Sequence, residues 1–205
     1  MQVYKTLGKA GVAQLLEKKS RFIGCALPVT TEEEAGAHLA AVKKQHPGAT
    51  HYVYAYTLRE QGRTRYSDDG EPHGTAGMPV LEVLRGEEVF DAAVVVVRYF
   101  GGTLLGTGGL QRAYGAAAKA AVLAAGVQEI SLCTRYTLSL PYALRDSAAQ
   151  LVEQACTKEV NFDYAGEVTL TYIMKVGQGD ELALALQNLT KGRAPTQSEP
   201  FYMPF

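Results

Sequence analysis

The chain has 205 residues, of which 47% are hydrophobic and 20% are charged, and its formal net charge is −1 at pH 7. This composition is typical of a soluble globular protein with one large or two small domains. The near-neutral charge excludes a chain-wide attraction to nucleic acid or membrane, so any anion must be held by a local group of charges. No apolar run of about 18 residues is present, which excludes a transmembrane helix. The N-terminal segment lacks an apolar signal region, so we expect a cytoplasmic protein with no membrane partner.

Three cysteines are widely spaced at Cys25, Cys133 and Cys156. An odd number without C-x-x-C spacing argues against a disulfide framework or a zinc site. We therefore expect buried thiols in a reducing compartment, and neither a metal nor a cofactor.

The first elements have clear apolar patterns. Residues 12–19 and 21–29 predict two strands of a hairpin. Thr31 followed by Glu34 forms a capping box and predicts the start of a helix that ends at the His-Pro-Gly of 46–48.

The next segment is strand-like and then polar. Residues 51–58 alternate, with three tyrosines on one face, and predict a strand whose tyrosine face is covered by a helix; base stacking by these rings is the alternative. Residues 61–63 predict a turn, and residues 66–77 predict a loop. Pro79 favours the first turn of a short helix that is closed by Gly86.

Four consecutive valines from Val94 predict a buried strand, and an alanine-rich helix is predicted from about Leu110 to Ala125. The remaining chain follows the order β-α-β-β-α-β of a ferredoxin-like fold. These elements are predicted at 136–140, 144–157, 160–164, 168–172, 182–189 and 201–205. We therefore expect an α+β protein with two domains, 1–130 and 135–205. The two prolines of the last segment confine it to a sheet edge.

The connection between the valine strand and the following helix is rich in glycine. Its glycines are Gly101, Gly102, Gly106, Gly108 and Gly109. Glycine is used where the backbone needs positive φ or close approach, and N–H groups at a helix start bind anions such as phosphate. The spacing from Gly101 to Gly106 is that of a P-loop, but Thr107 stands where that motif needs lysine. The alternative is a tight structural turn that packs strand against helix.

Basic residues flank this connection. Arg98 precedes it, while Arg112 and Lys119 are seven residues apart on the following helix. Two converging arginines, Arg98 and Arg112, would clamp a carboxylate or phosphate. Two ordinary salt bridges are an equal alternative.

A second polar loop carries three carboxylates and an imidazole. Asp68, Asp69, Glu71 and His73 are of the types that hold a divalent cation or act as general acid and base, but their spacing matches no known metal motif. We favour a solvated loop whose carboxylates make local turns or pair with Arg98 and Arg112. Since the two loops have complementary charges, we expect them to meet and form one cleft, with Gly74 and Thr75 at its rim.

Two long segments resemble a known family. DDGEPHGTAGMP at 68–79 and VVVVRYFGGTLLGTGGLQRAY at 94–114 resemble the paired signature of the YigZ/IMPACT family. The resemblance implies an N-terminal domain like the second domain of ribosomal protein S-five and a C-terminal domain like the last domain of elongation factor G. Eukaryotic members of the family regulate translation and carry a different attached domain.

The residues and the resemblance together predict a non-enzymatic regulator of translation. It would bind RNA, the ribosome or a translation factor through the glycine-rich groove, with a monomer favoured. One alternative is an enzyme acting on a small phosphate compound, because the same fold hosts kinases. The other is a protein–protein adaptor, which an exposed apolar patch would favour.

Overall fold

The structure is a computed structural model that describes residues 2–60 and 62–205. It divides the chain into a larger unit, Tyr4–Gln128, and a smaller unit made of residues 129–205 together with Gln2 and Val3. The change from one unit to the other falls at the start of the long strand β7 (Val127–Leu140). No helix in the described part of the chain is both long and apolar enough to cross a membrane.

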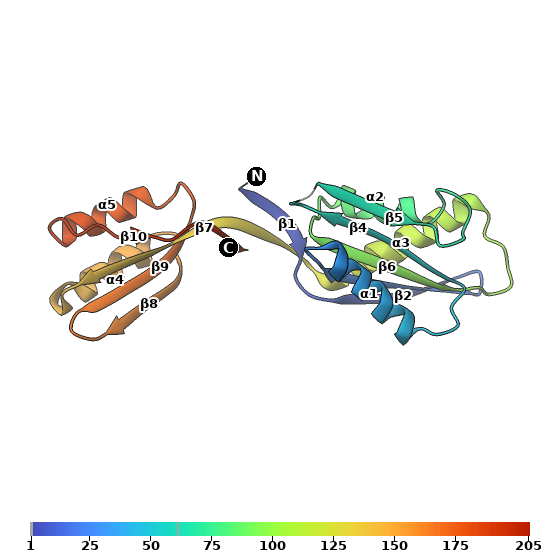
Figure 1. Ribbon diagram of the computed structural model, residues 1–205, viewed down its shortest axis with the longest axis horizontal. Coiled ribbons are helices and arrows are strands. Elements are labelled where there is room, and N and C mark those ends of the chain that lie inside the picture. The colour runs from blue at the N-terminus through green and yellow to red at the C-terminus, as the bar shows by residue number, and fades with distance from the viewer. Residues whose placement is uncertain (1, 61) are drawn as a thin grey trace. The chain divides into compact units, whose positions relative to one another are not determined.

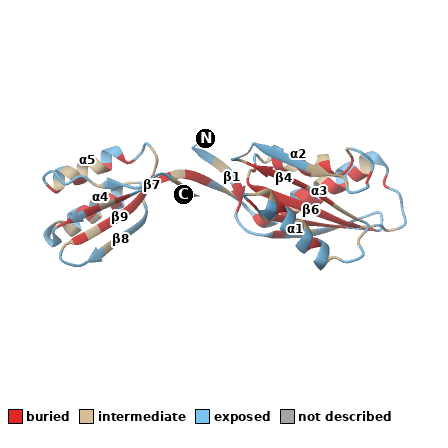
Figure 2. Ribbon diagram, in the orientation of Figure 1, coloured by how far each residue is buried: buried red, intermediate tan, exposed pale blue. Residues whose placement is uncertain are grey.

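The larger unit is built on an antiparallel five-stranded sheet with the spatial order β2-β3-β6-β4-β5 (Figure 1). Its strands are β2 (Gly11–Glu17), β3 (Ser20–Pro28), β4 (His51–Leu58), β5 (Arg63–Ser67) and β6 (Ala92–Tyr99), and β1 (Val3–Leu7) precedes them. The valine strand β6 is central and buried on both faces, which explains its unbroken apolar run (Figure 2).

Helices cover both faces of this sheet. On one face Val42 of α1 (Glu32–Gln45) packs against Ile23 and Val95. On the other face, α2 (Gly77–Gly86) and α3 (Thr107–Ala125) pack over the side chains of β3 and β6 that point away from α1. The described larger unit is thus a three-layer arrangement of helix, sheet and helix pair, as Figure 1 shows.

Small residues let α3 approach the sheet closely. A Cβ on Gly24 would lie 2.4 Å from the carbonyl oxygen of Ala117, and one on Gly11 would lie 2.3 Å from the amide nitrogen of Ala125. Any side chain at these positions would displace the helix. The alanine-rich face of α3 is therefore matched by glycines in β2 and β3.

Several predicted boundaries differ from the structure. β5 occupies part of the segment predicted as turn and loop, and α2 begins at Gly77, the last residue of that predicted loop. Gln61 of the predicted turn lies outside the described residues. Helix α3 begins at Thr107, three residues before the predicted start, because Gly106 with φ +73° forms its N-cap. The helix cap at Thr31 is confirmed, since its side chain accepts a hydrogen bond from the Glu34 N–H.

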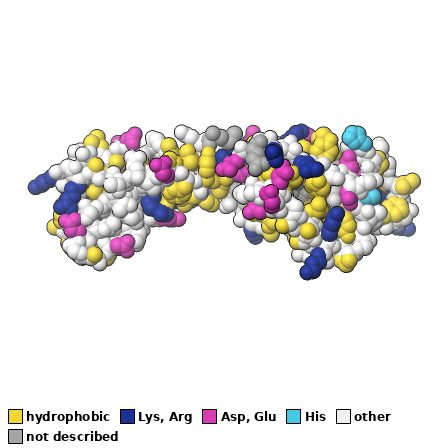
Figure 3. All heavy atoms as spheres, viewed as in Figure 1, with side chains coloured by type: hydrophobic (Ala, Val, Ile, Leu, Met, Phe, Trp, Pro, Cys, Tyr) yellow, Lys and Arg dark blue, Asp and Glu magenta, His cyan; other side chains and the backbone are white. Residues whose placement is uncertain are grey.

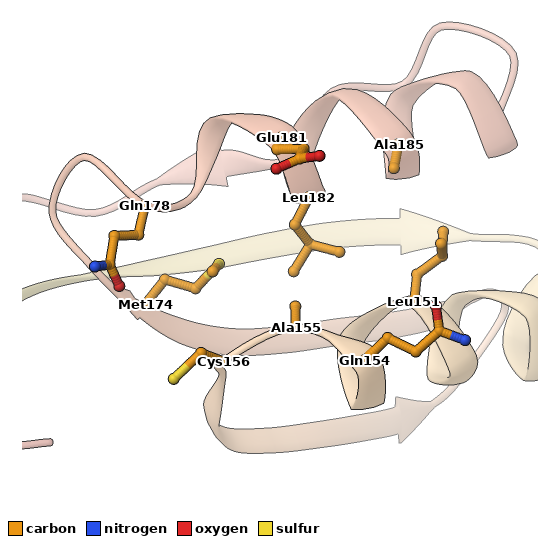
Figure 4. A pocket seen from close by; sticks show the side chains of 9 residues that line it. All are labelled: Leu151, Gln154, Ala155, Cys156, Met174, Gln178, Glu181, Leu182 and Ala185. Carbon is orange, nitrogen blue, oxygen red and sulfur yellow. The ribbon is translucent and has the colours of Figure 1, made fainter.

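The smaller unit has the predicted βαββαβ order. After β7 its elements are a 3-10 turn (Tyr142–Leu144), α4 (Arg145–Gln154), β8 (Lys158–Tyr164), β9 (Val168–Lys175), α5 (Asp180–Leu189), β10 (Thr196–Gln197) and β11 (Phe201–Pro204). Strand β11 pairs with β7. Between α4 and α5 lies a shallow hollow of about 400 Å³ over Leu182 and Met174 (Figure 4). Glu181 is the one charged residue in its lining.

The three cysteines are all free thiols. Cys25 and Cys133 are buried, as expected from the sequence. Cys156 is exposed, so the expectation of a buried thiol is wrong at this position. It follows the end of α4 and lines the shallow hollow (Figure 4).

Candidate binding site around the glycine loop

The carboxylate of Asp68 caps the start of α2. It accepts hydrogen bonds from the backbone N–H groups of Gly74 at 2.9 Å, Ala76 at 3.1 Å and Gly77 at 2.8 Å. Burial alone would raise the pKa of Asp68, but these hydrogen bonds outweigh it and hold the pKa below its ordinary value. Asp68 therefore shapes its own loop, residues 68–76, which we call the acidic loop.

Asp69 fastens the acidic loop to β4. Its carboxylate accepts a hydrogen bond from the Tyr52 N–H at 2.6 Å. Its carbonyl oxygen lies 2.7 Å from Nδ1 of His51. Because a carbonyl oxygen only accepts, Nδ1 carries a proton and donates it to this bond.

Glu71 is the buried centre of the acidic loop. Its Oε1 accepts hydrogen bonds from Nη1 of Arg98 at 2.6 Å and from the hydroxyl of Tyr114 at 2.7 Å. The Glu71 and Arg98 side chains are only 4% and 6% exposed. Burial, reinforced by the Glu71 carboxylate, raises the pKa of Tyr114 far above its ordinary value. Glu71 and Arg98 thus neutralise each other inside the molecule. Arg98 therefore presents no free positive charge to an external anion.

The acidic loop meets the loop of residues 100–106, which we call the glycine loop. A groove of about 420 Å³ opens between them. It is lined by Thr50, His51, Glu71, Pro72, Arg98, Phe100, Leu104, Leu105, Gly106, Thr107 and Leu110. We call it the central groove.

The glycine loop packs against the tight turn between β2 and β3. A Cβ on Gly101 would lie 2.0 Å from the carbonyl carbon of Lys19, and the Gly101 N–H donates to Oγ of Ser20 at 3.1 Å. Gly102 has φ +79°. The prediction that these glycines serve close approach and positive φ is therefore confirmed at Gly101, Gly102 and Gly106.

The turn between β2 and β3 consists of two exposed lysines, Lys18 and Lys19, and we call it the lysine turn. A second groove, of about 380 Å³, runs between Lys18 and Arg112 of α3, with Gly109 and Leu105 in its lining. No ion-pair partner for Lys18, Lys19 or Arg112 is found among residues 2–60 and 62–205. Lys18 and Arg112 therefore line the second groove as unpaired cations, with Glu17 as the one carboxylate in its lining. Lys19 lies next to the glycine loop through the contact of its backbone with Gly101.

Comparison with known proteins gives one consistent result. The model of the Impact N-terminal domain matches residues 18–122. The chain is 40% identical to IMPACT family member YvyE of Bacillus subtilis over 169 residues, covering 78% of each chain. It is 36% identical to IMPACT family member YigZ of Escherichia coli, covering 85% of this chain and 87% of that one. The chain belongs to the IMPACT family.

A solved structure shares the fold. It is a crystal structure described as a hypothetical protein, with 32% sequence identity and a TM-score of 0.62, and the match covers 100% of this IMPACT chain and 98% of the other. The family match at 18–122 includes the acidic loop, the glycine loop, the lysine turn and most of α3.

The structure separates some of the predicted site residues. Arg98 lines the central groove in its pair with Glu71, whereas Arg112 lines the second groove. They therefore do not form a two-arginine clamp, and at Arg98 the alternative of a salt bridge is the one observed. Lys119 forms an ion pair with Glu87 at 3.6 Å, just beyond the end of α2. It lines neither groove.

Other predicted residues have structural roles. The Thr75 hydroxyl donates to the Pro72 carbonyl at 2.6 Å, Gly74 has φ +74°, and His73 lies 3.7 Å from Asp68. Within residues 2–60 and 62–205 no group of three or more His, Cys, Asp or Glu side chains is placed to hold a metal ion. In this IMPACT protein the side chains of Asp68, Asp69 and Thr75 hold the backbone of the acidic loop and of its neighbours through hydrogen bonds.

Sequence reasoning missed the lysine turn. In the sequence, Lys18 and Lys19 stand out only as the polar break of a hairpin. Gly101, which contacts this turn, is 81 residues from Ser20 along the chain. The usable signal was the pair of adjacent lysines in a hairpin turn, where both adopt positive φ.

Proposed function

We propose that this IMPACT-family protein regulates translation without catalysis, by binding RNA of the translation apparatus around the start of α3. The observation that carries the proposal is the packing of Gly101 on the backbone of Lys19 and Ser20. This contact holds the lysine turn beside the glycine loop. The resemblance of the two domains to parts of a ribosomal protein and of elongation factor G supports translation as the setting.

The start of α3 suits a phosphate group. Its N-cap, Gly106, supplies no side-chain hydrogen bond, so the first N–H groups of the helix are left for an external acceptor. Lys18 and Arg112 add unpaired positive charge in the groove beside this point, and Lys19 follows Lys18 in the same turn. Figure 3 shows why such local grouping matters: on the visible face, basic side chains are scattered among acidic ones and form no continuous basic surface.

Gly108 supports close approach of a ligand at this point. Its backbone is helical, and a Cβ there would meet nothing closer than the Arg112 guanidinium at 3.6 Å. Neither backbone conformation nor internal packing therefore requires glycine in the first turn of α3. A phosphate lying against this turn would explain the glycine, because a side chain at this position would block its approach.

The variant Gly108→Ala is expected to weaken RNA binding about tenfold while leaving the fold intact, because the added methyl group blocks contact with the first turn. Gly115→Ala is the matched control: it lies two turns along the same face of α3, and a Cβ there meets no atom within 4 Å. Both alanines favour the helix, with a gain of up to about 1 kcal/mol. Fluorescence anisotropy with a labelled single-stranded RNA measures both variants, and equal affinities for the two would count against phosphate binding at α3.

Replacing the lysine turn by Lys18→Ala with Lys19→Ala is expected to lower RNA affinity and to flatten its dependence on salt. Each RNA phosphate that a lysine no longer neutralises removes about 0.7 to 1 unit from the slope of log K against log salt. Lys43→Ala with Lys44→Ala is the control, because it removes the same charge from the end of α1 on the other face of the sheet. Similar slopes in both double variants would contradict the proposal, as would turnover of a nucleoside triphosphate by the wild type.

A further inference from the structure

The walls of the central groove are apolar and partly uncovered. Phe100 is 46% exposed and Leu104 is 83% exposed, and they face a groove that also contains Leu105 and Leu110. A large aliphatic side chain in water gains free energy when a partner covers it. The groove therefore favours an apolar group as occupant.

Among the polar residues that line the groove, His51 can supply an acceptor and Arg98 a donor. His51 donates through Nδ1 to the Asp69 carbonyl, so in the neutral ring Nε2 keeps its lone pair; this atom lies 3.7 Å from Glu71. Arg98 donates through Nη1 to Glu71, but its buried Nε has no hydrogen-bond partner among the described residues. Both residues line the groove.

This combination fits a peptide better than an anion. A peptide group supplies one N–H for an acceptor and one C=O for a donor, and its side chain supplies the apolar group. A phosphate would find no free cation in the central groove, since Arg98 is neutralised by Glu71. The volume of about 420 Å³ is in the range of small ligand sites.

We propose that the central groove binds an extended segment of a partner protein, with an apolar side chain seated between Phe100 and Leu104. The peptide N–H donates to Nε2 of His51, and a carbonyl accepts from Nε of Arg98. Phe100, whose ring centroid lies 5.3 Å from the Arg98 guanidinium, shifts to admit that carbonyl. The central groove adjoins the start of α3 at Gly106 and Thr107, but peptide binding there does not depend on RNA binding.

The test is a titration of the full ¹⁵N-labelled chain with the blocked peptide Ala-Ala-Leu-Ala-Ala, followed by amide chemical shifts. Saturable shifts are expected in the glycine loop and around His51. The all-alanine peptide of the same length is expected to bind roughly tenfold more weakly, because it buries less apolar surface. Adenosine is titrated in parallel, since a nucleobase stacked on Phe100 is the competing occupant.

Leu104→Ser is the deciding variant. Leu104 makes little contact within the chain, so the fold is retained, and affinity for the leucine peptide is expected to fall roughly tenfold. Leu184→Ser is the control, because Leu184 is 58% exposed on α5 in the other unit. No saturable shift with the leucine peptide, tighter binding of adenosine, or an unchanged Leu104→Ser variant would overturn the proposal. RNA affinity of Leu104→Ser is expected to equal that of the wild type, so failure here is distinguishable from failure of the RNA proposal.

Discussion

Replacing Arg98 by methionine is expected to lower the free energy of unfolding of the larger unit by about 3–5 kcal/mol, because the variant leaves the Glu71 carboxylate buried without its cationic partner. Tyr114 still donates one hydrogen bond to this carboxylate, but one neutral donor does not replace a guanidinium. Urea unfolding followed by circular dichroism measures the loss.

Two further variants test whether the unpaired Glu71 carboxylate causes this loss of stability. Adding Glu71→Gln to Arg98→Met removes the orphaned charge, so the double variant is expected to be more stable than Arg98→Met alone. Arg85→Met removes an exposed arginine that pairs with Glu82, and is expected to change stability by less than about 1 kcal/mol. A loss of similar size in Arg85→Met and Arg98→Met would contradict the structural role assigned to the buried pair.

Replacing Gly101 by alanine is expected to have the second large effect, and it acts on both stability and RNA binding. The new Cβ would lie 2.0 Å from the Lys19 carbonyl carbon and 2.4 Å from the Ser20 amide nitrogen, so backbone on both sides must move. Such overpacking costs about 1–3 kcal/mol. Because the lysine turn moves away from the start of α3, RNA affinity is expected to fall about tenfold or more, as measured by anisotropy.

The control for Gly101→Ala is Gly36→Ala in α1, where a Cβ would meet no atom within 4 Å. It is expected to leave RNA affinity unchanged and to stabilise the helix slightly. If Gly101→Ala binds RNA as tightly as the wild type, the contact between the glycine loop and the lysine turn does not organise the site.

Local pattern was sufficient for most elements of the fold. Strand β4 has a tyrosine at every second position from Tyr52 to Tyr56, and β6 is an unbroken apolar run, so both were predicted. Strand β5 was missed because Arg63, Thr64 and Arg65 are all exposed at the sheet edge, where no buried face imposes an apolar alternation.

The candidate site was predictable only in part. Glycine content marks the loop at 101–109, because positive φ and close approach are local demands on the backbone. The state of Arg98 was not predictable from charge alone: the sequence suggested either an anion clamp or a salt bridge, and only the fold brings Glu71 within 2.6 Å. The lysine turn depends on a contact between distant segments, and such contacts leave no periodic signal.

The most direct test of the central claim is hydrogen–deuterium exchange of the full chain with and without a saturating single-stranded RNA. If RNA binds around the start of α3, amide exchange is expected to slow in peptides covering residues 15–21 and 100–112, while peptides covering α1 and residues 129–205 exchange as before. Slowed exchange confined to residues 129–205, or no change anywhere at low salt, would contradict the account.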